Sequence, residues 1–131
     1  MAPTRVDEAA GLTVADVMHS RFSALPASAN VGEAQEWFAE STSHRLALIA
    51  DDGRYLGRLV PGDVADADPA QPAVALAQRG PTVGPDEPAG RGEQLALESG
   101  IRRVPVVDHD DRVLGIVAIT TDLQGFCGTG G

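Results

Sequence analysis

The chain has 131 residues, of which 43% are hydrophobic, and a formal net charge of −9 at pH 7. That length and hydrophobic content suit one ordinary domain, or two small halves that share a core, and they argue against wholesale disorder. The negative charge argues against nucleic acid and anionic membranes as partners, because neither would attract the chain electrostatically. No apolar run approaches the roughly 20 residues of a membrane span and the N-terminus has no signal-peptide core, so we expect a cytoplasmic protein.

The first predicted elements follow an N-terminal extension of residues 1–11. An extended segment near 23–25 precedes a helix with apolar side chains on one face. These side chains are Val31, Ala34, Trp37 and Phe38. Asn30 and Glu33 form a variant of the capping box at the start of this helix. A strand over 46–49, a tight turn at Asp52-Gly53, a second strand over 55–60 and a short helix are expected to complete the unit.

The second half of the chain predicts the same elements in the same order. An extended segment at 82–83 precedes a helix that carries Ala89, Leu95 and Ala96 on its apolar face and stops at Gly100. Strands over 104–107 and 113–119 and a closing short helix follow. The order of helix, strand, strand and helix is therefore predicted twice.

Direct comparison shows that the two halves are copies of one unit. Arg45–Ile49 matches Arg103–Val107, and Leu56-Gly57 matches Leu114-Gly115, both at an offset of 58 residues. The offset runs from about residue 18 to about residue 117, which gives one repeat over 12–67 and another over 72–127. Each repeat alone would bury too little apolar surface. We expect an α/β (α+β) fold with pseudo-twofold symmetry, each repeat being a small sheet packed with helices, with clefts where the halves meet.

Both copies resemble CBS domains, the module first recognised in cystathionine β-synthase. The second copy carries the likeness in "VGPDEPAG…LALESGIRRVPVVDHDDRVLGIVAITTDL", and the first carries it in "ALPASANVGEAQEWFAESTSHRLALIADDGRYLGRLVPGDV". The resemblance covers nearly the whole chain and implies a Bateman module, a tandem CBS protein. Such modules commonly pair into flat dimers. Many of them bind adenosine-containing ligands such as AMP, ATP or S-adenosylmethionine between their repeats.

The ligand signature of the family is glycine, two apolar residues, Ser or Thr, two variable residues and then Asp. A carboxylate can accept hydrogen bonds from both hydroxyls of a ribose, and a hydroxyl beside a helix N-terminus suits a phosphate. In the first copy Asp63 has the right spacing from Gly57, but Val60 replaces the hydroxyl. In the second copy Asp122 lies one residue too far from Gly115, and Ala118 takes the hydroxyl position.

The second repeat is the better candidate site. It offers two hydroxyls and one carboxylate, and an extra residue could bulge to bring a threonine into the pocket. The first repeat has Pro61 where an amide donor might sit, and Asp66 and Asp68 would repel a phosphate. The structural alternatives stay open: either Asp can be a helix N-cap, and the threonines can simply end a strand. The resemblance implies these ligand-binding residues: Asp122, Thr120, Thr121, Pro105, Val106 and Asp63, with the "PV" pair lining the adenine slot.

The sequence offers no residues for catalysis. All ten basic residues are arginine, which excludes a Walker P-loop, a Schiff base and a lysine general base. Cys127 is the single cysteine and has no neighbouring base, and His19, His44 and His109 lack the spacing of metal ligands. We expect no catalytic residue, no required cofactor and no metal.

Two functions remain. The first is a stand-alone CBS-pair regulatory module that binds an adenine nucleotide or related adenosine-containing ligand and signals to a regulated protein partner. The second is a ligand-free homodimeric scaffold or adaptor that keeps the fold without functional pockets. Both include a homodimer, because the apolar faces near Trp37, Phe38 and Leu95 exceed what one small core can cover.

Overall fold

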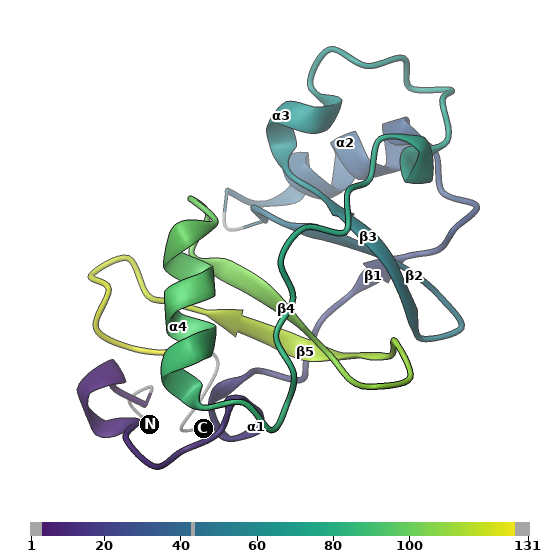
Figure 1. Ribbon diagram of the computed structural model, residues 1–131. Coiled ribbons are helices and arrows are strands. Elements are labelled where there is room, and N and C mark those ends of the chain that lie inside the picture. Colours follow the sequence, from purple (N-terminus) through teal and green to yellow (C-terminus); the bar gives the residue numbers. More distant parts are fainter. Residues whose placement is uncertain (1–3, 43, 128–131) are drawn as a thin grey trace. The chain divides into compact units, whose positions relative to one another are not determined.

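The computed structural model describes residues 4–42 and 44–127, which form small sheets and short helices (Figure 1). The elements in chain order are η1 (Val6–Glu8), α1 (Val14–Val17), β1 (Ala24–Leu25), α2 (Val31–Glu40), β2 (Ala47–Asp51), β3 (Arg54–Leu59), α3 (Pro61–Val64), η2 (Ala73–Ala75), α4 (Ala89–Glu98), β4 (Arg103–Val107) and β5 (Val113–Ala118). The predicted α/β class is confirmed. Within the described part of the chain, every helix is too short or too polar to cross a bilayer.

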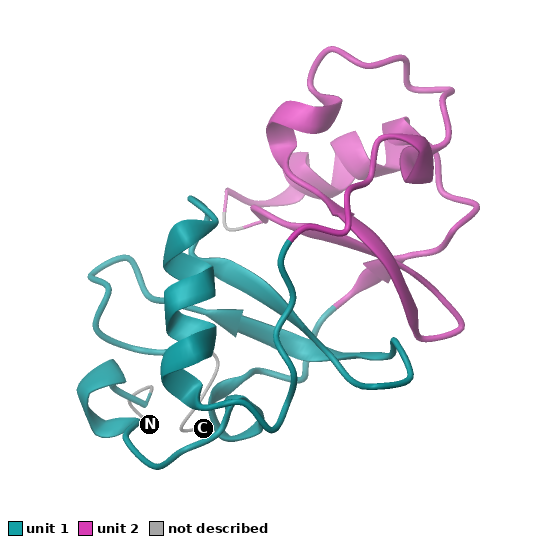
Figure 2. Cartoon of the chain, in the orientation of Figure 1, with its two compact units in different colours: residues 1–22, 81–131 teal, residues 23–80 magenta. Residues whose placement is uncertain are grey.

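The chain divides into two compact units (Figure 2). Unit 1 contains the chain up to Phe22 and again from Pro81 onward, and unit 2 is Ser23–Gly80. The sequence repeats at 12–67 and 72–127 divide the chain differently, because residues 12–22 open the first repeat but pack in unit 1.

Unit 2 has a three-stranded sheet in the order β1-β2-β3, with β1 parallel and β3 antiparallel to β2. Helix α2 begins as predicted: the Asn30 side chain accepts from the backbone N–H of Glu33 at 2.9 Å, and the Glu33 carboxylate accepts from the N–H of Asn30 at 3.4 Å. The β2–β3 turn has Asp52 and Gly53 at φ of 51° and 82°, which is the conformation that the Asp-Gly pair favours. The core of unit 2 consists of Val31, Ala34, Ala47, Ile49, Leu59, Val64 and Ala73.

Unit 1 pairs β4 with β5 antiparallel, and helix α4 packs against both strands and against α1. Gly92 makes this packing possible, because a Cβ there would lie 3.2 Å from Val117 and 3.3 Å from Val14. Helix α4 ends as predicted before Gly100, which has a φ of 78°. The closing helix predicted for this repeat is wrong: residues after β5 form a turn instead.

The start of the first repeat packs with the strands of the second. In unit 1, Thr13 forms a β-bridge with Pro88, and His19 exchanges two backbone hydrogen bonds of 3.0 Å with Ile116. These contacts hold residues 12–19 in unit 1, where Val14 and Val17 are fully buried in the core.

Unit 2 contains the reciprocal arrangement. Asn30 bridges to Pro72, and Arg58 exchanges backbone hydrogen bonds of 2.8 and 3.1 Å with Gln78. The strand residues of the two bridges correspond at the predicted offset of 58. The opening segments correspond at 59, because Gln78 occupies the position of His19. The extended segments keep the offset of 59, since Ala24 pairs with Leu48 and Val83 pairs with Val106. The two repeats therefore differ in length by one residue between the extended segment and the helix that follows it.

Both crossing segments approach a glycine. A Cβ on Gly115 would lie 2.6 Å from the carbonyl oxygen of His19, and a Cβ on Gly57 would lie 3.0 Å from the Cβ of Ala77. No side chain fits at Gly115 without moving backbone. The first residue of the ligand signature therefore has a structural role in both repeats.

Candidate functional site

The candidate site in the second repeat is the turn that follows β5. The Thr120 hydroxyl donates to Asp122 Oδ1 at 2.5 Å, and the same carboxylate oxygen accepts from the backbone N–H of Gln124 at 3.0 Å. The Thr120 hydroxyl oxygen also accepts from the N–H of Gly125 at 3.1 Å. Asp122 and Thr121 are exposed, and Thr120 is half-buried. The turn therefore presents a carboxylate and two hydroxyls at one end of β5.

Hydrogen bonding lowers the pKa of Asp122. The Thr120 hydroxyl is the largest cause, the N–H of Gln124 is the next, and the positive charge of Arg5 adds a small effect in the same direction. A hydrogen bond to a carboxylate favours its charged form. Asp122 is therefore negatively charged at neutral pH and acts as an acceptor only.

The N-terminal segment holds this turn in place. The N–H of Val6 donates to the carbonyl of Gln124 at 2.8 Å, and the N–H of Phe126 donates to the carbonyl of Thr4 at 2.8 Å. The Phe126 side chain is fully buried in the core of unit 1. Residues on both sides of Asp122 are anchored, so the turn is positioned by the fold rather than by the acidic side chain alone.

The structure does not bring the predicted adenine-slot residues to this turn. Val106 is fully buried in the core of unit 1, and Pro105 is buried beside it. Pro105 pairs with Ile116, which is four residues from Thr120, or about 13 Å along an extended strand. Arg102 contacts the residue just before the turn, because its Nε donates to the carbonyl of Ile119 at 3.2 Å.

The Asp63 side chain caps the start of helix α3 in the first repeat. Its Oδ2 accepts from the backbone N–H of Val60 at 2.8 Å, at the start of helix α3. The side chain is half-buried, and Pro61 occupies the first helical position. Val60 supplies no hydroxyl beside it, so this end of the strand pair presents a single, engaged carboxylate.

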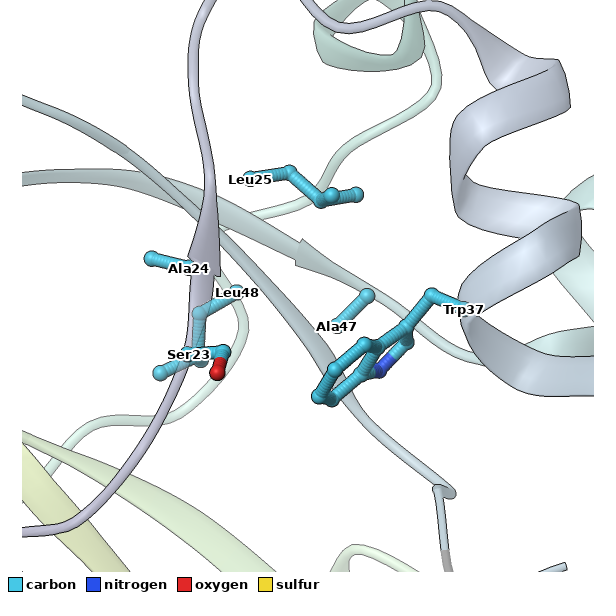
Figure 3. Close-up of a pocket in the computed structure, with 6 residues that line it drawn as sticks. All are labelled: Ser23, Ala24, Leu25, Trp37, Ala47 and Leu48. Carbon is cyan, nitrogen blue, oxygen red and sulfur yellow. The ribbon is translucent and has the colours of Figure 1, made fainter. Parts of the chain in front are cut away.

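A small apolar pocket lies in unit 2, where the sequence indicated none (Figure 3). It holds about 200 Å³ of empty space, part of it open to solvent, and is lined by Ser23, Ala24, Leu25, Trp37, Ala47 and Leu48. Pockets that enclose a drug-sized ligand are larger, at roughly 300–1,000 Å³. This pocket is too small to enclose a ligand of that size.

Trp37, which lines this pocket, belongs to an aromatic pair. The Trp37 indole stacks on the His44 ring with a centroid distance of 3.8 Å and an interplanar angle of 6°. The indole N–H donates to the carbonyl of Leu46 at 3.3 Å, and His44 Nδ1 lies 2.7 Å from the carbonyl oxygen of Trp37. The sequence placed Trp37 in a core or dimer surface, and its half-buried position beside Ser23 and Ala24 was not predictable from helical spacing.

Comparison with known proteins identifies the architecture. The sequence profile of the CBS domain matches residues 74–121, and the solved structures that resemble this chain include pairs of such domains. The chain therefore has the fold of a CBS domain pair. A search of curated proteins found no match.

Three solved structures illustrate the likeness. The cystathionine beta-synthase pair domain from Shewanella oneidensis MR-1 is 21% identical with a TM-score of 0.70, over 77% of this chain and 61% of that one. The cytosolic domain of the Mg²⁺ channel MgtE in complex with ATP is 22% identical, with a TM-score of 0.66, over 78% of this chain and 44% of that one. CBSX2 in complex with AMP is 24% identical, with a TM-score of 0.68, over 81% of this chain and 89% of that one.

The chain thus spans less than two thirds of the first two of these structures and most of the third. At these identities the likeness establishes the fold of the CBS pair. What each of the three proteins binds is a property of that protein.

Proposed function

We propose that this CBS domain pair is a regulatory module that binds an adenosine-containing ligand of the AMP, ATP or S-adenosylmethionine type and signals to a partner protein. The observation that carries the proposal is the exposed, charged Asp122 with its Thr120 hydroxyl at the end of β5. Structures of the same fold are described as complexes with AMP and with ATP, which supports the ligand class. CBS domain pairs are generally regulatory modules rather than catalysts.

The chemistry of the turn suits a ribose. Asp122 Oδ1 already accepts two hydrogen bonds, whereas no donor in residues 4–42 and 44–127 bonds to the second oxygen of this exposed side chain. A diol can donate to that oxygen and exchange with the Thr120 hydroxyl, so the carboxylate loses no partner when a ligand binds. Thr121 is exposed next to it and supplies a second hydroxyl for a phosphate. Pro105, Val106 and Asp63 stay proposed ligand-binding residues, although the structure places none of them at this turn.

Calorimetric titration with AMP, ATP and S-adenosylmethionine tests this function. We expect Asp122→Ala to weaken the binding of the preferred ligand at least tenfold, because losing a charge-assisted hydrogen bond costs about 1.5–3 kcal/mol. Asp63→Ala is the matched control, since it removes a carboxylate from the equivalent end of the other repeat and should change affinity much less. Equal losses in the two variants, or no loss for Asp122→Ala, would contradict the assignment.

Asp122→Ala also removes two hydrogen bonds that hold the turn, so a second variant is needed. Asp122→Asn keeps an oxygen that can accept from Thr120 and Gln124 but removes the negative charge. We expect it to retain the melting temperature of the wild type and to lose affinity. A variant that binds the ligand as tightly as wild type would show that the charge is not used.

A ligand-free scaffold is the second candidate, and one observation favours it. Both signature carboxylates are engaged within the protein, Asp122 with Thr120 and Gln124 and Asp63 with the N–H of Val60. A thermal-shift panel separates the two functions, because a ligand at 100 times its Kd stabilises the folded state by about 2.7 kcal/mol. No shift with any adenosine-containing compound would favour the scaffold.

We also propose a homodimer without catalytic activity. Leu97 on α4 is 40% exposed and Trp37 and Phe38 on α2 are half-buried, and apolar helix faces of this kind are covered in symmetric dimers. Light scattering should give twice the chain mass of 13.6 kDa; a monomer at micromolar concentration would contradict it. In residues 4–42 and 44–127, no three His, Cys, Asp or Glu side chains are grouped to hold a metal.

A further inference from the structure

Two arginines of unit 2, Arg58 and Arg79, come from segments that pair side by side, and Arg58 stands where the ligand signature has an apolar residue. Arg58 is on β3, directly opposite Leu48 of β2, and its backbone exchanges hydrogen bonds of 2.8 and 3.1 Å with Gln78. Arg79 follows Gln78 in the chain. The crossing segment 77–80 therefore brings the second arginine beside the strand that carries the first.

A buried tyrosine fixes Arg79. The Tyr55 side chain is fully buried, and its hydroxyl donates to the carbonyl of Arg79 at 2.6 Å. In return, Arg79 Nη1 donates to the carbonyl of Tyr55 at 3.0 Å, and the guanidinium carbon lies 5.1 Å from the centre of the tyrosine ring. The three contacts hold the guanidinium against the ring face, in the geometry of a cation–π interaction.

A glycine fixes Arg58. A Cβ on Gly80 would come within 2.4 Å of Arg58 Nε and 2.9 Å of Nη2, so the guanidinium lies directly against the glycine backbone. Gly80 has a φ of +59°, which glycine adopts without strain. The Arg58 side chain is half-buried, and in the described part of the chain its guanidinium has no hydrogen-bond or ion-pair partner.

The positive charges of Arg58 and Arg79 both act on Tyr55. Burial raises the pKa of Tyr55 to about 12, while the positive charges of Arg58 and then Arg79 act in the opposite direction. An anion bound by the Arg58 guanidinium would be stabilised further by the positive charge of Arg79. A guanidinium has five N–H donors in a planar fork that matches the oxygens of a phosphate.

The arginine pair is not a requirement of the fold. In unit 1 the position of Arg58 is taken by Ile116, and Ser20 follows His19 where Arg79 follows Gln78. Both units form the same strand crossing, so the crossing does not need charge. The pair is a property of unit 2 alone, in a chain whose net charge is −9.

We propose that Arg58 and Arg79 form an anion site that binds the phosphate groups of a small molecule. The site is made by residues of unit 2 and does not depend on the adenosine proposal, whose Thr120–Asp122 turn belongs to unit 1. A free polyphosphate and the phosphate tail of a nucleotide share the chemistry that the arginines recognise. Adenosine, which has no phosphate, lacks it.

Calorimetry on the full chain with inorganic pyrophosphate, ATP and adenosine tests the site. We expect pyrophosphate to bind wild type, and Arg58→Gln to weaken it about tenfold or more. Arg21→Gln is the matched control, because Arg21 is exposed, and its guanidinium has no partner in the described part of the chain; this variant should bind within about twofold of wild type. Failure of pyrophosphate to bind wild type, or equal binding to Arg58→Gln, would overturn the site.

A second pair of variants keeps every charge. Gly80→Ala moves the Arg58 guanidinium, whereas Gly11→Ala introduces the same kind of backbone strain, at a φ of +85°, where a Cβ meets nothing within 4 Å. We expect Gly80→Ala to weaken pyrophosphate binding several-fold and Gly11→Ala to leave it unchanged. Equal affinities in these two variants, both checked to be folded, would show that the position of Arg58 does not matter.

The two proposals fail separately. Pyrophosphate binding that depends on Arg58, with no adenosine-containing ligand affected by Asp122→Ala, would support the anion site and reject the proposed nucleotide site. ATP binding that depends on Asp122 and is indifferent to Arg58→Gln would do the reverse. ATP that loses affinity in both variants would support both sites.

Discussion

The two strand pairs of this protein begin alike and end differently. In both units an antiparallel pair with a register shift carries a glycine against the crossing segment, Gly57 in unit 2 and Gly115 in unit 1. In unit 2 the strand leads directly into α3, where Asp63 caps the helix. In unit 1 the chain turns back, and Asp122 accepts hydrogen bonds inside that turn.

The difference shows that one aspartate signature can have two local roles. A carboxylate beside unpaired backbone N–H groups is stabilised whether those groups belong to a helix start or to a turn. The extra residue before Asp122 is accommodated as a turn, and a hydroxyl becomes the partner of the carboxylate. Of the two strand ends, only this turn leaves a hydroxyl and a charged oxygen exposed together. The number of residues between the signature glycine and the aspartate therefore decides which strand end is suited to a ribose.

The largest expected effect concerns the glycine that both strand pairs share. Gly115→Ala places a methyl group 2.6 Å from the His19 carbonyl oxygen, and overpacking of this kind typically costs 1–3 kcal/mol or more. We expect the free energy of unfolding to fall by about 3 kcal/mol and the melting temperature to fall by on the order of 10 °C. Calorimetric melting measures both.

Gly90→Ala is the control for that variant. A Cβ at Gly90 meets nothing within 4 Å, and alanine is favoured over glycine in a helix by up to about 1 kcal/mol. This variant should melt at the same temperature or higher. If Gly115→Ala were equally harmless, the crossing segment could not be packed as the structure shows.

A smaller effect is expected from the tyrosine that only unit 2 contains. Tyr55→Phe removes the hydrogen bond to the Arg79 carbonyl and should lower the free energy of unfolding by about 1 kcal/mol. Unfolding experiments at neutral pH measure this loss. Val113, the counterpart in unit 1, makes no such bond, so the loss belongs to unit 2.

The same tyrosine gives a pH dependence. Its pKa is about 12 in the folded protein and about 10 when unfolded, so its stabilising contribution is complete below pH 10 and is lost as the pH rises toward 12. Tyr55 is the only tyrosine in the chain, so tyrosinate absorbance follows it alone. A midpoint near 10 in the folded protein would show that the ring is not buried.

The smallest effect concerns the turn of unit 1. Thr120→Val removes the largest cause of the lowered pKa of Asp122, so we expect that pKa to rise toward the ordinary value of about 3.9. In wild type, the contribution of Asp122 is present above about pH 4 and is lost as the pH falls through its folded pKa. Carboxyl carbon shifts in an NMR titration report the change, and an unaltered midpoint would exclude the Thr120 bond.

The sequence by itself determined the local structure. Hydrophobic periodicity placed α2 and α4, Asn30 and Glu33 marked a helix start, and Asp52-Gly53 marked a turn, because each of these signals acts over a few residues. The repeat also predicted two similar strand pairs. The prediction of a closing helix in the second repeat was wrong, because a single extra residue changed how the backbone groups after β5 could form hydrogen bonds.

Only the tertiary structure decided which residues lie together. The opening segment of each repeat crosses to the strands of the other, which no short-range pattern encodes, and that crossing made Gly57 and Gly115 structural residues. It also brought Arg79 to Tyr55 and Arg58, which are more than 20 residues away in sequence. Contacts between residues so far apart in sequence depend on which strand edge is left unpaired after local folding. The chain fills that edge with a distant segment because the backbone groups of the whole unit need hydrogen-bond partners.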